Sequence, residues 1–399
     1  MVAGEASGDL LASLLLGGLR QRWPDLTASG IGGPAMAKQG FEAWWPHHLL
    51  SVHGYSLEVL RRLRGLLALR RELGDRLLKE RPDAFIGVDA PDFNLGLERR
   101  LKEAGIRTVH FVSPSIWAWR GGRIDKIRAA VDHVLCLFPF EPELYQRAGI
   151  AATYVGHPLA DAIPLEPPRA AARTALGLAE SDQVIALLPG SRRGEIRYIA
   201  PRLLAAAALL HRQRPGLRFI LPVVPGLRAM MEPLVAQHAA GTPVQLIDGQ
   251  SHAALAACDL TLIASGTATL EAALFKRPMV IVYAMQWLSW QRMRRMAYQP
   301  WVGLPNILLS QRWAAPELAT PLGGRTPHGG LGAASEAFIV PELLQDAATP
   351  EAIAREALAW LDSPSRCAGL QQRFTELHHT LRQDTARRAT DAIAQVIGR

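Results

Sequence analysis

The chain alternates short apolar runs with longer amphipathic segments, and this pattern recurs along most of its length. The apolar runs are rich in Val, Ile and Leu without regular polar alternation, which is typical of parallel strands covered on both faces. We predict strands at Ala84–Val88, Thr108–Val112, Val134–Leu137, Val184–Leu188, Phe219–Val223, Leu260–Ile263 and Met279–Val282. We predict helices at Leu10–Trp23, Ser56–Lys79, Leu95–Ala104, Tyr198–Arg214 and Thr267–Phe275. Repeated strand–helix units indicate an α/β chain of doubly wound parallel sheets.

The strand–helix pattern pauses at Gly156–Arg173, a proline-rich stretch that is typical of an interdomain linker. We therefore expect a first domain over residues 1–165, a second over 166–348 and a helical tail over 349–399. A second irregular stretch, Trp313–Ala337, is rich in glycine and proline and predicts a surface loop.

Composition narrows the class of protein. Of the 399 residues, 49% are hydrophobic and 20% charged, which excludes a disordered or collagen-like chain. The net charge of +8 favours an anionic partner, whether phosphate, nucleic acid or an anionic membrane surface. The three cysteines are widely spaced and no Cys/His cluster exists, so we expect neither a disulfide set nor a metal site. The apolar run Leu10–Leu19 is too short to span a bilayer, so we expect a cytoplasmic protein.

Two turns in the second half could bind a nucleotide diphosphate. The first, with Gly190, Ser191 and Arg192, follows a predicted strand and opens a helix, where unpaired backbone N–H groups bind phosphate. Arg192 could add a bidentate contact, although an ordinary turn with a solvated arginine explains the pattern equally well. The turn matches neither the Walker A motif nor Gly-x-Gly-x-x-Gly, so ATPase and dehydrogenase functions that use these motifs are disfavoured.

The second turn, with Ser265, Gly266 and Thr267, also joins a predicted strand to a helix. Glu271 follows Thr267 by one helical turn, where its carboxylate could accept hydrogen bonds from a ribose diol. The alternative is a capped helix with an ordinary surface glutamate.

Acidic residues follow strand ends in the first half. Glu5 and Asp9 lie where the first helix opens, and Asp89 directly follows an apolar run. Ligands bind at the carboxyl ends of parallel strands, so Asp89 is a candidate general base. Asp92 can be explained as a helix cap. Further on, Ser113–Arg120 includes Ser113 and Trp117 and could line an acyl or sugar pocket, although tryptophan more often packs in a core.

The segment Ser56–Lys79 combines a leucine stripe with Arg61, Arg62 and Arg64. Basic, leucine-rich amphipathic helices can lie in a membrane interface. A helix packed on the core with a solvated basic face is the alternative, and the residues alone favour it. A second basic, tryptophan-containing stretch runs over Met285–Trp301.

Eight motifs, taken together and in order, resemble the lipid-A-disaccharide synthase family over nearly the whole chain. They are GEASGD (Gly4–Asp9), GVDAPDFN (Gly87–Asn94), SPSIWAWR (Ser113–Arg120), FPFE (Phe138–Glu141), GHPLAD (Gly156–Asp161), LPGSR (Leu188–Arg192), SGTATLE (Ser265–Glu271) and LPN (Leu304–Asn306). The resemblance implies a GT-B glycosyltransferase fold, with two Rossmann-like domains facing across a cleft and C-terminal helices that return to the first domain.

The resemblance also implies a reaction and roles for residues. The donor is UDP-2,3-diacylglucosamine, the acceptor is 2,3-diacylglucosamine 1-phosphate, and the products are a β-1,6-linked disaccharide 1-phosphate and UDP, with inversion. Arg192 and the backbone around it would hold the diphosphate, Glu271 the ribose, and Asn306 would help to fix the donor. Asp89 would be the base, with Glu5 and Asp9 as weaker candidates that position the acceptor. No cofactor or metal is implied.

Because both substrates carry acyl chains, the resemblance favours peripheral binding to the cytoplasmic face of the inner membrane, with the basic helix at its anionic surface. A second copy of the chain is a further candidate partner. Two other functions stay open: a UDP-sugar epimerase or hydrolase that needs no lipid acceptor, and a non-catalytic binder of anionic surfaces. Nucleic acid is disfavoured because the arginines accompany leucine stripes rather than stacking aromatics.

Overall fold

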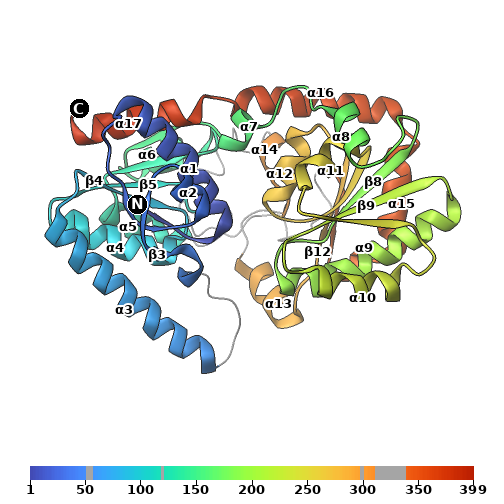
Figure 1. The fold of residues 1–399 in the computed structure, drawn as a ribbon, viewed down its shortest axis with the longest axis horizontal. Coiled ribbons are helices and arrows are strands. Elements are labelled where there is room, and N and C mark those ends of the chain that lie inside the picture. Colours follow the sequence, from blue (N-terminus) through green and yellow to red (C-terminus); the bar gives the residue numbers. More distant parts are fainter. Residues whose placement is uncertain (51–56, 118–120, 297–300, 311–337) are drawn as a thin grey trace. The chain divides into compact units, whose positions relative to one another are not determined.

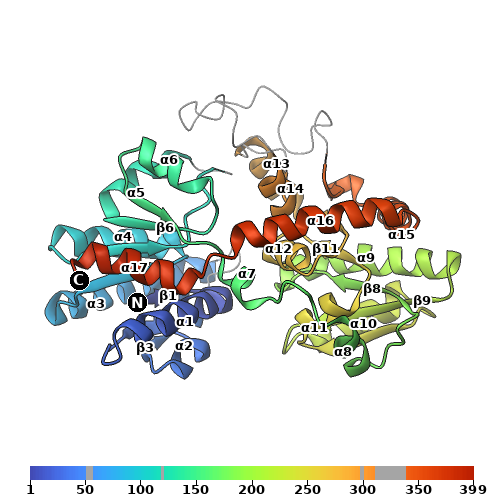
Figure 2. The ribbon, with the colours of Figure 1, turned by 90° about the horizontal axis from the view of Figure 1, so that it is seen from above.

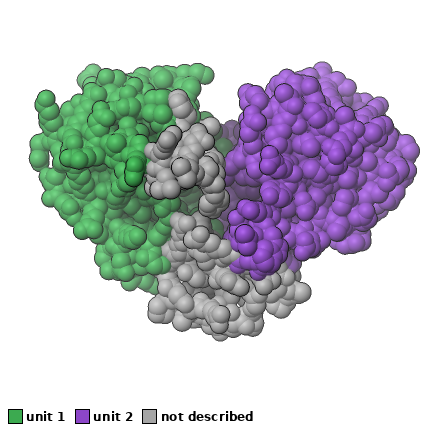
Figure 3. Space-filling model, turned by 90° about the horizontal axis from the view of Figure 1, so that it is seen from below, with its two compact units in different colours: residues 1–161, 321–323, 380–399 green, residues 162–320, 324–379 purple. Residues whose placement is uncertain are grey.

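The computed structural model describes residues 1–50, 57–117, 121–296, 301–310 and 338–399, and the chain forms two compact units. The first unit holds Met1–Asp161 and Thr380–Arg399, and the second holds the described residues between Ala162 and His379. Each unit is built on one parallel sheet with helices packed against it (Figures 1 and 2). Figure 3 shows the two units in separate colours.

The first unit contains a seven-stranded sheet in the order β3-β2-β1-β4-β5-β6-β7, with every pair parallel. The strands are β1 Val2–Ala3, β2 Ser29–Gly32, β3 Glu42–Pro46, β4 Ala84–Val88, β5 Arg107–Phe111, β6 His133–Cys136 and β7 Ala152–Tyr154. The chain winds outward from β1 through β2 and β3, and then outward from β4 on the other side. The strand order therefore reverses between β1 and β4, and an open α/β sheet binds ligands beside such a reversal.

Helices cover both faces of this first sheet, because right-handed crossovers on either side of the reversal place them on opposite faces. One group comprises α1 (Glu5–Arg22), α2 (Pro34–Lys38) and α17 (Thr385–Ile397). The other comprises α3 (Leu57–Glu80), α4 (Pro91–Glu103) and α5 (Ile124–Ala130). A buried apolar cluster under the second group joins Leu73 and Leu77 of α3 to Phe85 of β4 and Leu97 of α4.

The second unit contains a six-stranded parallel sheet in the order β10-β9-β8-β11-β12-β13, so its reversal lies between β8 and β11. The strands are β8 Gln183–Leu188, β9 Leu217–Val223, β10 Val244–Asp248, β11 Leu260–Ala264, β12 Met279–Tyr283 and β13 Glu342–Leu344. The helices are α8 Arg169–Ala175, α9 Arg193–Gln213, α10 Arg228–His238, α11 Ser251–Ala257, α12 Thr267–Leu274, α13 Trp287–Met296, α14 Leu304–Leu309, α15 Pro350–Leu361 and α16 Pro364–Leu381.

The C-terminus completes the first unit. The Asp161 carboxylate, at the end of α7 (Pro158–Ala162), accepts hydrogen bonds from the backbone N–H groups of Asp384 (3.0 Å) and Thr385 (2.7 Å). A carboxylate at this position accepts hydrogen bonds from unpaired N–H donors and interacts favourably with the positive end of the α17 dipole. The last helix then lies along α1 (Figure 1). Helices α15 and α16, as far as His379, belong to the second unit.

All seven predicted strands and five predicted helices are present, with small shifts of their ends. Helices α1 and α9 begin several residues earlier than predicted, at Glu5 and Arg193. The proline-rich stretch contains α7 and the first part of α8 as well as irregular backbone. The loop predicted at Trp313–Ala337 lies outside the described residues. Among the helices that the structure describes, none combines the length and the apolar character needed to cross a bilayer.

Candidate active site

Asp89 lies at the reversal of the first sheet, directly after β4. Its backbone φ is +51° and that of Ala90 is +43°, so two successive non-glycine residues adopt the left-handed conformation. Such strain costs on the order of 1–3 kcal/mol per residue and is concentrated at functional sites. Asn94 stabilises the turn: its buried Nδ2 donates to the Asp89 carbonyl (2.8 Å) and to the Val2 carbonyl (3.4 Å). The ends of β4 and β1 are thereby tied together.

Glu5 lies at the same reversal, because α1 begins at this residue directly after β1 and Gly4. The backbone therefore places Glu5 and Asp89 at the carboxyl ends of adjacent strands. A Cβ on Gly4 would lie 3.1 Å from the Ala90 Cβ, so the two turns pack closely.

A fully buried pair lies beneath the Asp89 turn. Glu98 Oε1 of α4 is 2.7 Å from His110 Nδ1 of β5, and neither side chain is exposed. A Cβ on Gly87 would lie 2.2 Å from Glu98 Oε1, so glycine in β4 leaves the space that the carboxylate occupies. Burial alone lowers the pKa of His110, but the carboxylates of Glu98 and Asp89 outweigh it and raise the pKa. Titratable groups with shifted pKa values are concentrated at functional sites.

Asp9, by contrast, caps a helix. Its carboxylate is buried and accepts hydrogen bonds from the backbone N–H groups of Gly33 (2.9 Å), Ala35 (2.8 Å) and Met36 (3.0 Å) at the start of α2. These bonds satisfy donors that a helix N-terminus leaves unpaired. The geometry gives Asp9 a structural task next to the reversal.

Ser113 and Trp117 are also buried. The Ser113 hydroxyl lies 2.8 Å from the hydroxyl of Tyr145, and Trp117 Nε1 donates to Glu141 Oε1 (2.9 Å). The Trp117 ring meets Phe138 and Phe140 edge-on. Burial raises the pKa of Glu141 to about 7 although hydrogen bonds to its carboxylate oppose this shift. The motif Phe138–Glu141 therefore holds the Ser113–Trp117 segment in a packed aromatic cluster.

In the second unit, the turn after β8 holds an anion at a helix N-terminus. The carboxylate of Glu195 accepts hydrogen bonds from the backbone N–H groups of Ser191 (3.1 Å) and Arg192 (3.3 Å). Gly190 has φ +106°, and a Cβ there would lie 2.6 Å from Glu195 Oε2. The Arg192 side chain is about half exposed and pairs with Glu195 at 3.3 Å. A turn that already holds a carboxylate has the donors and dipole that bind phosphate.

The turn after β11 lies at the other side of the same reversal. Gly266 has φ +147° and open space where a Cβ would be, so its backbone is accessible to a ligand. Thr267, the first residue of α12, is exposed, whereas the Ser265 hydroxyl donates to the Val302 carbonyl (2.6 Å). The structure thus brings the turns of Arg192 and Thr267 to one end of the sheet.

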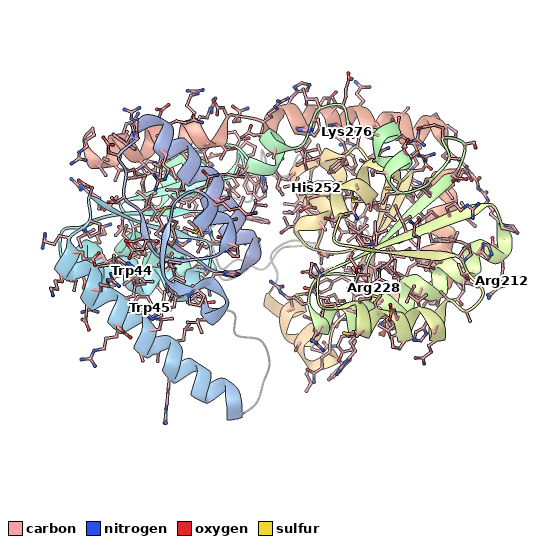
Figure 4. The ribbon with its side chains drawn as sticks, in the orientation of Figure 1. Trp44, Trp45, Arg212, Arg228, His252 and Lys276 are labelled. Carbon is pink, nitrogen blue, oxygen red and sulfur yellow. The ribbon has the colours of Figure 1, made fainter. Side chains whose placement is uncertain are left out.

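Glu271 lies one turn further along α12 and has a partner that sequence reasoning missed. His252 Nε2, from the first turn of α11, lies 3.4 Å from Glu271 Oε2, and the imidazole ring is tilted against Phe275 (Figure 4). The hydrogen bond with Glu271 raises the pKa of His252, and burial opposes this shift only in part. The His252–Glu271 pair orients the Glu271 carboxylate beside the turns that follow β8 and β11.

Asn306 is buried and hydrogen-bonded within the protein. Its Nδ2 donates to the Val340 carbonyl (2.9 Å) and to Glu342 Oε1 (2.7 Å), and its Oδ1 accepts from the N–H groups of Ile339 and Val340. Glu342 in turn accepts from the N–H groups of Val302 and Gly303, and burial raises its pKa to about 7. The LPN motif therefore fixes the backbone at Val302 and Gly303, directly before α14 and next to Ser265.

The basic helix α3 packs on the core through its second half, while Arg64 and Leu67 are exposed. Arg61 and Arg62 lie earlier on the same helix. Trp44 of β3 also packs against this core, with the Arg76 guanidinium 3.5 Å from its ring centroid, and Trp45 meets it edge-on (Figure 4). In the second unit, Trp287 and Leu288 of α13 are 65% and 66% exposed.

Metal ligands do not gather in the described parts of the chain, where no group of three His, Cys, Asp or Glu side chains is placed to hold an ion. The arginine and helix N-termini of the second unit are the groups that can meet an anion there.

Comparisons with known proteins decide the family. The family model described as lipid-A-disaccharide synthetase matches residues 1–320. The chain belongs to the lipid-A-disaccharide synthetase family. The lipid-A-disaccharide synthase of Albidiferax ferrireducens is 59% identical over all of this chain and 96% of its own length, and that of Verminephrobacter eiseniae is 55% identical over the same shares.

Solved structures support the fold class. A Listeria monocytogenes protein described as a putative UDP-N-acetylglucosamine 2-epimerase superimposes with a TM-score of 0.63 at 12% identity, over 99% of this chain and 95% of that one. MurG from Acinetobacter baumannii gives 0.54 at 15% identity, over 99% and 98%. These likenesses concern the fold alone. The GT-B fold class is confirmed, and membership of the lipid-A-disaccharide synthetase family confirms the prediction of a glycosyltransferase that forms the lipid A disaccharide.

Proposed function

We propose that this chain transfers the diacylglucosaminyl group of UDP-2,3-diacylglucosamine to the 6-hydroxyl of 2,3-diacylglucosamine 1-phosphate. The products are the β-1,6-linked disaccharide 1-phosphate and UDP. One observation carries the proposal: the strand-order reversal of each sheet carries groups that suit one of the two substrates. A strained acidic turn with Asp89 follows β4, and two phosphate-type turns with Arg192 and Thr267 follow β8 and β11.

In the proposed reaction, the Asp89 carboxylate accepts the proton of the acceptor 6-hydroxyl, and the oxygen attacks the anomeric carbon of the donor. The bond between that carbon and the diphosphate oxygen breaks as the new bond forms, so the configuration inverts. UDP leaves as an anion, and Arg192 with the N-termini of α9 and α12 stabilises its charge. Residues 1–165 then serve the acceptor and residues 166–348 the donor.

Other site residues receive narrower roles. Glu271, oriented by His252, accepts hydrogen bonds from the ribose diol. Gly190, Ser191, Ser265 and Gly266 supply backbone to the diphosphate. Asn306 acts by positioning the backbone beside Ser265, because its amide is already hydrogen-bonded within the protein. Glu5 is proposed to position the acceptor, whereas Asp9, Ser113 and Trp117 support the backbone around it.

The test is product formation by the purified enzyme supplied with both acylated substrates in detergent micelles. UDP and disaccharide 1-phosphate should form in equal amounts, and UDP should not form when the acceptor is left out. Conversion of the UDP-sugar without acceptor would instead favour an epimerase or hydrolase and would overturn the proposal.

The acyl chains of both substrates support peripheral binding at the cytoplasmic face of the inner membrane. In the first unit, exposed Arg64 and Leu67 on α3 combine basic charge with apolar surface, and in the second unit Trp287 and Leu288 on α13 add exposed apolar surface. Sedimentation with vesicles should show binding to anionic but not to neutral lipid, weakened by salt. The double substitution Trp287→Ser and Leu288→Ser should weaken it further, and unchanged binding would contradict this role of α13.

A further inference from the structure

A cavity of about 530 Å³ lies in the first unit between α3, α4 and the start of α5. Its lining includes Pro91 and Asp92, which continue directly from the Asp89 turn, so it opens beside the proposed base. Arg70 of α3, Arg123 before α5 and Lys126 of α5 bring three positive charges into the lining.

Among the residues that the structure describes, the positive charges lining this cavity are only partly balanced. Arg123 pairs with the carboxylate of Asp92, which is 80% exposed while Arg123 is 17% exposed. Arg70 and Lys126 make no ion pair or side-chain hydrogen bond with the residues that the structure describes. Three cations therefore face one carboxylate. A concave surface with this excess attracts an anion of more than one charge.

Arg70 is held in a defined place although it pairs with no carboxylate of the described residues. Its guanidinium lies against Gly96 of α4, where a Cβ would be 2.6 Å from Nη1 and 3.0 Å from Cζ. Glycine at this position gives the guanidinium room at the helix surface, and the Arg70 side chain is half-buried there. A restrained, unpaired guanidinium is a suitable group for bidentate binding of phosphate oxygens.

We propose that this cavity binds the phosphate monoester of the acceptor lipid, with Arg70, Arg123 and Lys126 as its cationic groups. The inference rests on the proposed function, since one pyranose ring separates the acceptor 6-hydroxyl from its 1-phosphate. An acceptor whose 6-hydroxyl reaches Asp89 must therefore place its phosphate close to the Asp89 turn. At neutral pH the monoester carries about 1.5 to 2 negative charges, which complements the excess of positive charge in the cavity.

The proposal is tested by comparing two acceptors in neutral detergent micelles: 2,3-diacylglucosamine 1-phosphate and the same lipid without its phosphate. Wild-type enzyme should use the phosphorylated acceptor with the higher kcat/KM. Arg70→Gln and Lys126→Gln should each lower kcat/KM for the phosphorylated acceptor by about tenfold or more, the effect of losing a charge-assisted hydrogen bond. The value for the other acceptor should stay within about twofold of wild type, so the preference for phosphate shrinks.

A matched control is Arg212→Gln, an exposed arginine on α9 of the second unit that makes no ion pair with the described residues (Figure 4). It should leave both values unchanged. Arg70→Lys should retain part of the preference, because it keeps the charge and loses the planar fork.

Three results would overturn the inference. The wild type could show no preference for the phosphorylated acceptor, or the Arg70 and Lys126 variants could keep the full preference. The variants could also lose activity only when the assay is repeated on vesicles of anionic phospholipid instead of neutral micelles. The last result would assign the cavity to membrane headgroups. Failure of the proposed function is distinguishable, because wild-type enzyme would then form no disaccharide from either acceptor.

Discussion

Two aspartates of the first unit lie near the strand-order reversal and have different tasks. Asp9 is surrounded by three backbone N–H groups that bind its carboxylate, which is the arrangement of a helix cap. Asp89 lies in a strained turn at the reversal of the sheet, where ligands bind. Sequence position alone could not separate them, because capping of α2 by Asp9 depends on a contact between residues far apart in the chain.

His157 is the residue that most directly links burial to pH. Burial lowers its pKa to about 4 from 6.5, and its ring stacks near Phe138 while Nδ1 accepts from the Leu159 N–H (3.2 Å). A depressed folded-state pKa stabilises the protein above pH 6.5, and this stabilisation is lost as the pH falls toward 4. His157→Gln should remove that part of the pH dependence, on the order of 3 kcal/mol in the free energy of unfolding.

The measurement is urea unfolding of wild type and His157→Gln at pH 7 and pH 4.5. The free energy of unfolding of the wild type minus that of His157→Gln should be smaller at pH 4.5 than at pH 7, because only the wild type loses the His157 contribution. A difference that does not change with pH would show that His157 does not titrate in this range. His133, whose pKa burial also lowers, is present in both proteins, so its effect cancels.

At the scale of elements, seven strands could be predicted from sequence because their hydrophobic runs are continuous and bounded by turns. Strands β1, β2, β3, β7, β10 and β13 were missed. Strand β1 has two residues, and Val2 and Ala3 owe their place between β2 and β4 to pairing with distant segments. The local pattern of hydrophobic residues does not predict pairing with distant strands. The same holds for the cavity with Arg70, Arg123 and Lys126, which three separate elements form.

The packing of α17 on α1 gives a test at this scale. A Cβ on Gly18 would lie 2.8 Å from the Ala386 carbonyl oxygen, whereas one on Gly17 meets only Gln39 Oε1 at 3.8 Å. Gly18→Ala should therefore destabilise the first unit by about 1–3 kcal/mol through overpacking. Gly17→Ala should stabilise it by about 0.5–1 kcal/mol, because alanine is the better helix former.

Chemical denaturation of the two variants, followed by circular dichroism, makes this comparison. The neighbouring glycine is the control, since both substitutions add the same methyl group to the same helix. Equal effects of the two substitutions would contradict the close contact between α1 and α17.

At the scale of the whole molecule, the two units have separate sheets and separate proposed ligands. UDP should therefore stabilise the second unit and leave the first unchanged. At a UDP concentration of 100 times its Kd, the expected gain in the free energy of unfolding is about 2.7 kcal/mol. Hydrogen exchange of intact enzyme, read by mass spectrometry on peptides from β8 and from β4, measures each unit in the same sample. Equal protection of both would contradict a donor site confined to the second unit.

At this scale, the net charge of +8 can be divided among three proposed anionic ligands. Arg192 is assigned to the donor diphosphate, and the Arg70 cavity to the acceptor phosphate. Exposed Arg64 is left for the membrane surface. The family and fold class could be inferred from eight ordered motifs, while the division of the positive charge among ligands required the contacts seen in the fold.

The central claim is that Asp89 removes the proton from the acceptor hydroxyl, and the most direct measurement is turnover by Asp89→Asn beside its affinity for UDP. The account predicts that disaccharide formation falls by at least about a hundredfold, since general base catalysis contributes roughly that much, while calorimetry gives a Kd for UDP within about twofold of wild type. Turnover near the wild-type rate would contradict the account.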